Sequence, residues 1–391
     1  MNAPAAYDLS PIGAVALVGG LLALGPLLWV WLRPALAGKG AQTGAARLQA
    51  LTVVTLFLTF DLVLFGAFTR LTDSGLGCPD WPGCYGSASP LGAREHIQTA
   101  QQVLPSGPVT HGKAWVEMIH RYLATGVGAL ITVMAVLSWI EARKRRAVLS
   151  PWWATATLVW VCVQGAFGAL TVTMKLYPAI VTLHLLGGLG LLALLAVQTR
   201  LTEPATGQMP AGLHAGTWLV AALSVVQITL GGWVSTNYAV LACSDFPTCQ
   251  GVWWPLMDFE HGFAVQRELG AGKDGAYLPF AALTAIHFVH RVGAFVVLTA
   301  LALLAWRLAA TGQPALRRAS FGVAAVAVWQ LASGLSNVVL GWPILAAMAH
   351  TAGAAALVAL LAVLLAQARG ARGSASAPAA PVPGRPLRPA T

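Results

Sequence analysis

The chain is poor in charged residues. Only 9% of its 391 residues are Asp, Glu, Lys or Arg, whereas 57% are hydrophobic and the mean hydropathy is +0.70. Soluble globular domains carry about 25% charged residues, so this composition excludes a soluble globule. Acidic residues are fewer than basic ones, with 13 Asp and Glu against 23 Lys and Arg. The sequence therefore predicts an integral membrane protein.

Nine apolar runs approach the ~20 residues that a helix needs to cross a bilayer. Each run must be helical, because lipid offers the backbone no hydrogen-bond partner. We expect an all-α integral membrane protein with spans at about 11–33, 48–70, 114–140, 152–174, 178–200, 213–236, 281–306, 319–341 and 343–368.

The basic residues indicate how these spans are oriented. Lys and Arg concentrate in the links after the first, third, fifth and seventh spans and in the C-terminal stretch: Arg33, Lys39, Arg47, Arg143, Lys144, Arg145, Arg146, Arg200, Arg307, Arg317, Arg318, Arg369, Arg372, Arg385 and Arg388. The positive-inside rule puts these links in the cytoplasm. We therefore expect the N-terminus outside and the C-terminus in the cytoplasm. The net charge of +10 is a topology signal and requires no nucleic-acid partner.

The two ends of the chain differ from the rest. No basic residue precedes the first apolar run, and the run is too long for a signal peptide, although Ala35-Leu36-Ala37 resembles a cleavage site. We interpret residues 1–47 as an extra transmembrane helix and a cytoplasmic link. Residues 369–391 are rich in Pro, Ala and Arg, which predicts a disordered cytoplasmic tail.

The remaining spans form a tandem repeat of about 165 residues. The Cys78 to Cys84 motif matches the Cys243 to Cys249 motif at an offset of 165, and the offsets place the repeats at roughly 50–200 and 215–368. Each copy has four spans, an even number, so both copies lie the same way up about an axis along the membrane normal. We expect two four-helix bundles, at 48–203 and 213–368.

Four histidines occupy matching places in the two copies. They are His120 and His184 in the first and His290 and His350 in the second, all in the outer half of the bilayer. A single buried histidine is most simply a packing residue, but four duplicated ones at one depth favour ligands. A pair on facing helices can hold a planar macrocycle through both axial positions of its iron, as in haem proteins. Zinc or copper is less apt, because two histidines leave the coordination open.

The cysteines form two loop pairs and one residue within a span. We expect disulfides Cys78–Cys84 and Cys243–Cys249, since both pairs lie in outer loops where an oxidising compartment permits them. A structural role is favoured, and a redox-active one stays open. Cys162 is expected to be a small core residue.

Glu117 makes the two copies unequal. It precedes His120 by three residues and so shares its helix face, whereas the matching position in the second copy is His287. This difference implies different tasks for the two sites, with Glu117 suited to proton transfer. The alternative is that Glu117 pairs with Arg121 or caps the helix.

Taken together, these residues resemble the haem A synthase family of bacterial type. The resemblance covers about 50–368 and depends on the segment Thr69-Arg-Leu-Thr-Asp-Ser-Gly-Leu-Gly77, Glu117-x-x-His-Arg121, His184, His290-Arg291 and His350. Family members oxidise the C8 methyl group of haem O, through an alcohol, to the formyl group of haem A. The helix at 11–33 is an addition to the eight spans usual in the family.

The resemblance implies a role for each residue. The first repeat would bind the substrate haem O through His120 and His184, and the second would hold a haem b cofactor, with its iron, through His290 and His350. Glu117 would assist catalysis. Expected partners are the haem O-producing farnesyltransferase, a membrane electron acceptor such as a quinone, and the lipid of a bacterial inner membrane. Three arginines near the outer face are candidates for propionate contacts: Arg70, Arg121 and Arg291.

Two other functions remain possible from the sequence. A dihaem b-type cytochrome could take electrons from quinol without modifying haem, although stacked haems at two depths would suit it better. A transporter could also arise from a two-fold repeat, but its polar residues should gather at the midplane. Four further histidines are interpreted as loop residues or as neighbours of the sites: His96, His111, His261 and His287.

Overall fold

The computed structural model of the protein describes residues 10–36, 44–144, 149–201 and 209–374. Within these ranges nine helices are long and apolar enough to cross a membrane, and no strand forms beyond isolated bridges. The predicted all-α multi-pass membrane protein is confirmed. The nine helices are α1 (Ile12–Leu36), α2 (Gly44–Leu71), α4 (His111–Arg143), α5 (Pro151–Thr173), α6 (Pro178–Leu201), α7 (Ala211–Thr236), α9 (Phe280–Ala310), α10 (Pro314–Val339) and α11 (Ile344–Ser374).

The helices extend past the apolar runs that predicted them. Among the helix starts, that of α10 lies furthest from its predicted position, at Pro314 and not at 319. Proline is well tolerated in the first turn of a helix, so α10 can begin there. At the other end of the chain, α11 continues to Ser374, five residues past 369, where we expect the tail to begin. The rest of that predicted tail, like Lys39, Arg145 and Arg146, lies outside the described residues.

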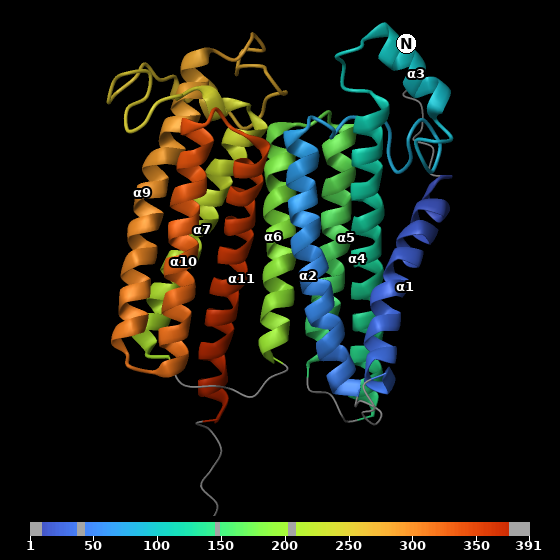
Figure 1. Cartoon of the computed structure of the whole chain (residues 1–391), viewed down its shortest axis with the longest axis vertical. Coiled ribbons are helices and arrows are strands. Elements are labelled where there is room, and N and C mark those ends of the chain that lie inside the picture. Colours follow the sequence, from blue (N-terminus) through green and yellow to red (C-terminus); the bar gives the residue numbers. More distant parts are fainter. Residues whose placement is uncertain (1–9, 37–43, 145–148, 202–208, 375–391) are drawn as a thin grey trace, which may run out of the picture.

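Eight of the helices form two rings of four. In the first ring α2 packs on α4, α4 on α5, α5 on α6 and α6 back on α2. The second ring repeats this order with α7, α9, α10 and α11. Consequently α4 and α6 lie diagonally across the first ring, and α9 and α11 lie diagonally across the second. Figure 1 shows the two rings side by side with their helices nearly parallel.

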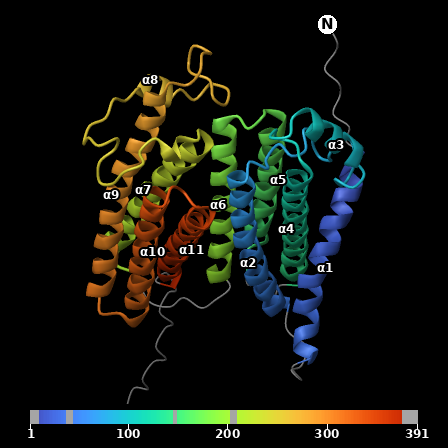
Figure 2. The same cartoon turned by 45° about the horizontal axis from the view of Figure 1, so that its top comes forward.

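The rings meet along α2, α6, α7 and α11, where Leu189 and Leu192 of α6 pack with Ala355 of α11 in one buried cluster. The additional helix α1 packs on α4 and α2, on the far side of the first ring (Figure 2). Val15 of α1 joins the buried cluster that contains Tyr122 of α4. Thus α1 covers part of the first bundle and lies away from the seam, the contact between the two rings along α2, α6, α7 and α11.

Cys162 was wrongly predicted to be a core residue, since it is exposed on α5. Only 11% of the apolar window of α5 is buried inside the protein. In a bilayer the outer surface of a helix is as apolar as its packed face, so hydrophobicity does not distinguish the two.

The long connections at one end of the rings carry the short elements α3 (Arg94–Val103), η1 (Ala239–Leu241) and α8 (Phe259–Gly262) (Figure 2). Both disulfide motifs lie here and fold alike. Tyr85-Gly86 and Gln250-Gly251 each take two successive positive φ angles, which is the geometry of a two-residue hairpin turn. In each motif the second cysteine bridges the residue after the turn.

Candidate functional site

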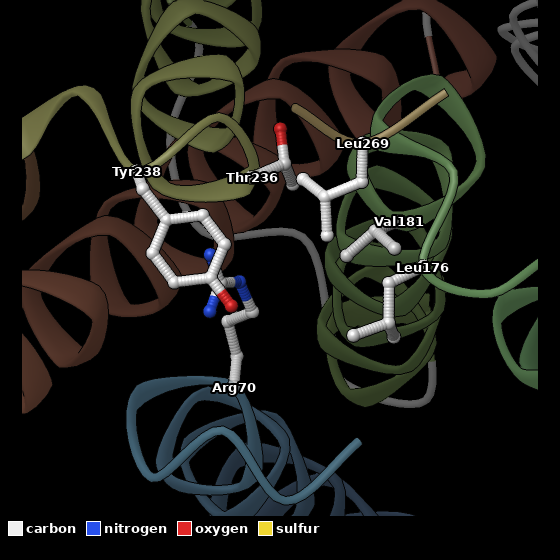
Figure 3. Close-up of a pocket in the computed structure, with 6 residues that line it drawn as sticks. All are labelled: Arg70, Leu176, Val181, Thr236, Tyr238 and Leu269. Atoms are coloured by element: carbon white, nitrogen blue, oxygen red, sulfur yellow. The ribbon is translucent and has the colours of Figure 1, made fainter. Parts of the chain in front are cut away.

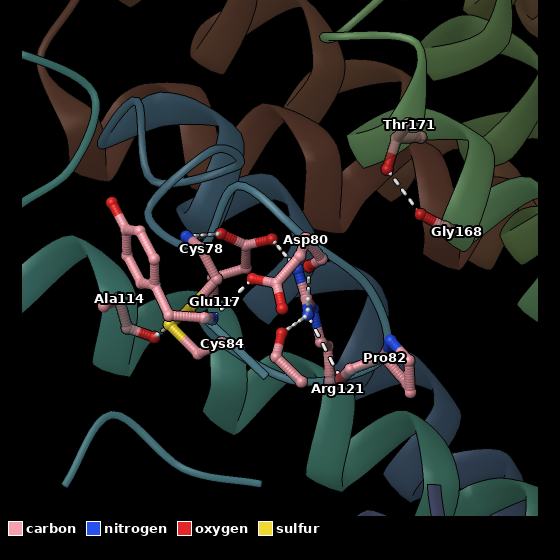
Figure 4. A network of polar contacts seen from close by, with 11 residues as sticks. Cys78, Asp80, Pro82, Cys84, Ala114, Glu117, Arg121, Gly168 and Thr171 are labelled. Atoms are coloured by element: carbon pink, nitrogen blue, oxygen red, sulfur yellow. Dashed lines mark hydrogen bonds and ion pairs between the residues drawn. A yellow bond between two sulfur atoms is a disulfide. The ribbon is translucent and has the colours of Figure 1, made fainter. Parts of the chain in front are cut away.

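Glu117 anchors the first disulfide loop to α4. Its carboxylate is 4% exposed, accepts a hydrogen bond from the backbone N–H of Cys78 at 2.8 Å and pairs with Arg121 one turn later. The Arg121 guanidinium also donates to the carbonyl oxygens of Asp80 at 3.0 Å and Gly83 at 2.5 Å (Figure 4). The predicted pairing with Arg121 therefore occurs, and both carboxylate oxygens have a donor.

His287 takes the place of Glu117 in the second bundle. Its Nδ1 lies 3.4 Å from the backbone nitrogen of Cys243, and its side chain is nearly fully buried in α9. Arg291 donates to the carbonyl oxygens of Cys243, Asp245 and Thr248 at 2.7, 2.8 and 2.9 Å. The second bundle thus has the same clamp, a helix side chain and an arginine that bind the backbone of the disulfide loop, with an imidazole in place of the carboxylate. His287 is a helix residue that holds the loop, a role that its alignment with Glu117 could have revealed.

The four predicted ligands enter the rings at similar depths. His120 and His290 follow the first residues of their helices, His111 and Phe280, by nine and ten positions. His184 and His350 each lie six positions after the first residue of their helices, Pro178 and Ile344. His120 on α4 lies across the first ring from His184 on α6, and His290 on α9 lies across the second ring from His350 on α11. Each diagonal helix pair therefore brings two imidazoles toward one bundle interior.

Each of these imidazoles lies against a glycine of the preceding long helix. A Cβ built on Gly66, Gly168, Gly231 or Gly334 would come within 3.1, 3.3, 3.0 and 3.2 Å of Cε1 of His120, His184, His290 and His350, respectively. A larger residue at these positions would displace the ring. The glycines fix where each imidazole can stand, and the same device appears four times.

The donor set fits a group ligated from two sides. Among the described residues no cluster of three or more His, Cys, Asp or Glu could hold a metal ion by itself. Two neutral imidazoles on diagonal helices suit a planar macrocycle whose iron needs only its two axial positions filled.

Arg70 joins the two rings at the end of the helices that carries the disulfide loops. It donates to the carbonyl oxygen of Ser235 at 2.5 Å, pairs with Asp73 at 3.2 Å and lies 4.0 Å from the ring centroid of Tyr238. Burial raises the pKa of Tyr238, whose hydroxyl donates to Asp73 at 2.7 Å. Figure 3 shows Arg70 beside the ring of Tyr238, in a small pocket that Leu176, Val181, Thr236 and Leu269 also line.

The three arginines proposed for propionates thus have protein partners of their own. Arg121 and Arg291 point into the disulfide loops, and Arg70 spans the seam. Propionate binding by any of them stays a prediction.

Both predicted disulfides are present. Cys78 pairs with Cys84 and Cys243 with Cys249, with Cα–Cα distances of 4.8 and 4.7 Å. Of the remaining histidines, His96 stacks on Tyr85 with ring centroids 5.4 Å apart, and His261 pairs with Asp258 at 2.8 Å. Both lie in the long connections, in α3 and α8.

The sequence is similar to known proteins over most of its length. The family model described as cytochrome oxidase assembly protein (COX15-CtaA) matches residues 49–362. Relatives named Heme A synthase include one from Shewanella oneidensis, 36% identical over 307 residues that cover 77% of this chain and 90% of the relative. One from Chelativorans is 31% identical over 77% of this chain and 84% of the relative. One from Allorhizobium ampelinum is 28% identical over 82% of this chain and 90% of the relative. The chain belongs to the haem A synthase family.

Proposed function

We propose that the protein is a haem A synthase, an oxidoreductase that converts the C8 methyl group of haem O through an alcohol to the formyl group of haem A. The observation that carries the proposal is the placement of two histidines on diagonal helices of each bundle, together with a buried carboxylate, Glu117, on the helix of His120 alone. The curated relatives named Heme A synthase support the same reaction.

In this proposal the first bundle is the substrate site. His120 and His184 would hold the iron of haem O, and the ring would lie between α4 and α6. The second bundle would hold haem b through His290 and His350, and when bound this cofactor supplies one-electron transfer. The glycine contacts of the four histidines orient the imidazoles for both tasks.

Glu117 would act as a fixed negative charge at the reacting carbon. Two donors, the Cys78 N–H and the Arg121 guanidinium, stabilise its carboxylate form. Preorganised charge of this kind stabilises positive charge that develops in a transition state. A proton taken up by Glu117 would have to compete with Arg121. We therefore favour the electrostatic role over that of a general base.

We further propose that the disulfide loops face outward from a bacterial inner membrane and that the C-terminus is cytoplasmic. The support is the excess of Lys and Arg in the links at the opposite end of the helices. A membrane acceptor such as a quinone would receive the electrons, and the farnesyltransferase that makes haem O would supply the substrate.

The alternative, a dihaem cytochrome that carries electrons across the bilayer, receives less support. Both histidine pairs lie at similar depth, so two haems held by them would offer no path through the membrane.

The test is extraction and mass analysis of haems from membranes that make haem O, with and without this protein. We expect haem A only when the protein is present. If the protein binds haem b and haem O stays unmodified, the cytochrome function replaces the proposed one.

A further inference from the structure

Three of the four site histidines have a glutamine amide at Nδ1. Gln164 Nε2 lies 3.0 Å from Nδ1 of His184 and donates to the carbonyl oxygen of His184 at 2.6 Å. Gln227 makes the same two contacts with His290, at 3.0 and 2.9 Å. Gln330 makes them with His350, at 2.9 and 3.1 Å, in the amide orientation that satisfies its neighbours. Each glutamine therefore holds both the ring and the backbone of its histidine.

A glycine on the histidine's own helix makes room for each amide. Cβ atoms on Gly187 and Gly293, three residues after His184 and His290, would collide with the amide oxygens of Gln164 and Gln227. A Cβ on Gly353, three residues after His350, would meet Cδ1 of Trp329 at 2.6 Å and the amide carbon of Gln330 at 3.1 Å. The glutamines also precede by four residues the glycines that contact the imidazoles. The pattern is Gln-x-x-x-Gly on one helix facing His-x-x-Gly on the next.

The fourth site, that of His120, has the histidine but lacks the glutamine and the glycine beside it. Gly66 and Gly231 contact their imidazoles in the same way, so Leu62 stands where Gln227 stands in the second bundle. Leu123 occupies the position three residues after His120, where the other sites have glycine. Nδ1 of His120 is buried and has no hydrogen-bond partner in the part of the chain that the structure describes. At His120 both the glutamine and the glycine of the other three sites are thus replaced by leucine.

This difference has a direct chemical consequence. Histidines that ligate metals through Nε2 nearly always bond another group through Nδ1, and loss of that group typically lowers metal affinity by about 10- to 100-fold. In these contacts the amide N–H donates to Nδ1, as an imidazole protonated at Nε2 requires. An imidazole that ligates through Nε2 carries its proton on Nδ1, and a half-turn of the amide would then present the oxygen as acceptor, in exchange for the bond to the histidine carbonyl. Gln164, Gln227 and Gln330 can therefore hold an imidazole in its ligating orientation. Among the described residues His120 has the Phe65 ring stacked on it at 6.3 Å, but no hydrogen-bond partner at Nδ1.

We propose that these three glutamines are positioning residues for haem ligation, and that His120 is the weakly held ligand through which the first bundle exchanges haem. This inference rests on the proposed function, since it concerns the same haem sites. It accounts for how two similar bundles can treat haem differently: the second retains its haem between two supported imidazoles, and the first releases its haem from one supported side. A substrate site must release its product, whereas a cofactor site must not.

The test exchanges the two environments. Gln227→Leu gives His290 the surroundings of His120, and the double variant Leu62→Gln, Leu123→Gly gives His120 the surroundings of His290. Purified protein is loaded with haem, and transfer to excess apomyoglobin is followed together with the low-spin electron paramagnetic resonance signal of the ligated iron. We expect Gln227→Leu to speed haem loss from the second bundle by about 10- to 100-fold and to change that signal. The double variant should slow loss from the first bundle.

Gln198→Leu is the matched control, because Gln198 is a buried glutamine that donates to Thr52 at 2.8 Å and contacts no imidazole of the sites. It should leave both rates and both signals unchanged. If haem binds and neither exchange variant alters the rate or the signal, the glutamines only pack and the inference is overturned. If the wild-type protein binds no haem, the proposed function fails and the inference fails with it.

Discussion

Glu117 and His287 occupy equivalent positions in the two bundles, and each faces the backbone N–H of the first cysteine in its disulfide loop. A carboxylate and an imidazole thus perform the same structural task. In the proposed function only the carboxylate brings a negative charge to the neighbouring histidine pair. The loop contact preserves the geometry of the clamp, while the charge distinguishes the two sites chemically.

Replacement of this charge should stop turnover and leave haem binding intact. We expect Glu117→Gln to lower haem A formation by roughly 100-fold or more, because the amide keeps an acceptor for the Cys78 N–H but removes the charge. Haem content by visible spectroscopy should equal that of the wild type. His287→Gln serves as the control and should retain turnover. Equal turnover of Glu117→Gln and the wild type would refute the role.

The glycine contacts predict a second set of effects. Gly231→Val should expel the His290 ring from its position, since a Cβ at this glycine already comes within 3.0 Å of the imidazole. The haem b spectrum of the purified variant should be largely lost. Gly216→Val on the same helix is the control, because a Cβ there meets nothing within 4 Å. Normal haem b content in Gly231→Val would contradict the assignment of His290 as a ligand.

The two disulfides should differ in importance. Removal of Cys78–Cys84 by paired serine substitutions frees the loop whose N–H holds Glu117, so we expect turnover to fall as well as stability, the latter by about 2 kcal/mol. Removal of Cys243–Cys249 should lower stability to a similar extent with a smaller effect on turnover. Thermal unfolding and haem A formation, measured on both variants, separate the two effects. Equal losses of turnover would argue against the link through Glu117.

Asp245 predicts an acid-sensitive loop. Hydrogen bonds from Thr248 and from the backbone N–H groups of Gln250 and Gly251 lower the pKa of Asp245 from its ordinary value of 3.8 to about 2. A lowered pKa stabilises the folded loop above about pH 4, and this contribution is lost as the pH falls toward 2. Hydrogen exchange at the Gly251 amide should therefore accelerate over this range in the wild type. Asp245→Asn should exchange with no corresponding acid transition, and an unchanged transition in that variant would disprove the assignment.

The sequence predicted the framework well because each feature has a local cause. Apolar runs of about the bilayer's thickness become helices wherever lipid excludes other structures. The cysteine spacing and the aligned histidines needed only the repeat to be recognised. The surroundings of those residues could not be predicted in the same way. Cys162 faces outward and Arg121 points into a loop, since hydropathy does not tell lipid from core and spacing does not show what a long side chain reaches.

The glutamines illustrate the same limit. Gln164 and Gln330 align between the repeats, but their contact with the imidazoles depends on how α5 faces α6 and α10 faces α11. Gln227 has no glutamine to align with, because its counterpart is Leu62. The difference acquires a meaning only when the helices are placed beside one another.

The most direct measurement supplies haem O and an electron acceptor to the purified, membrane-reconstituted protein and follows the haem by mass spectrometry. The account predicts the alcohol first and the aldehyde afterwards with the wild type, and bound but unmodified haem O with Glu117→Gln. Haem O that binds to the wild type and stays unmodified, or haem A formed equally well without Glu117, would contradict it.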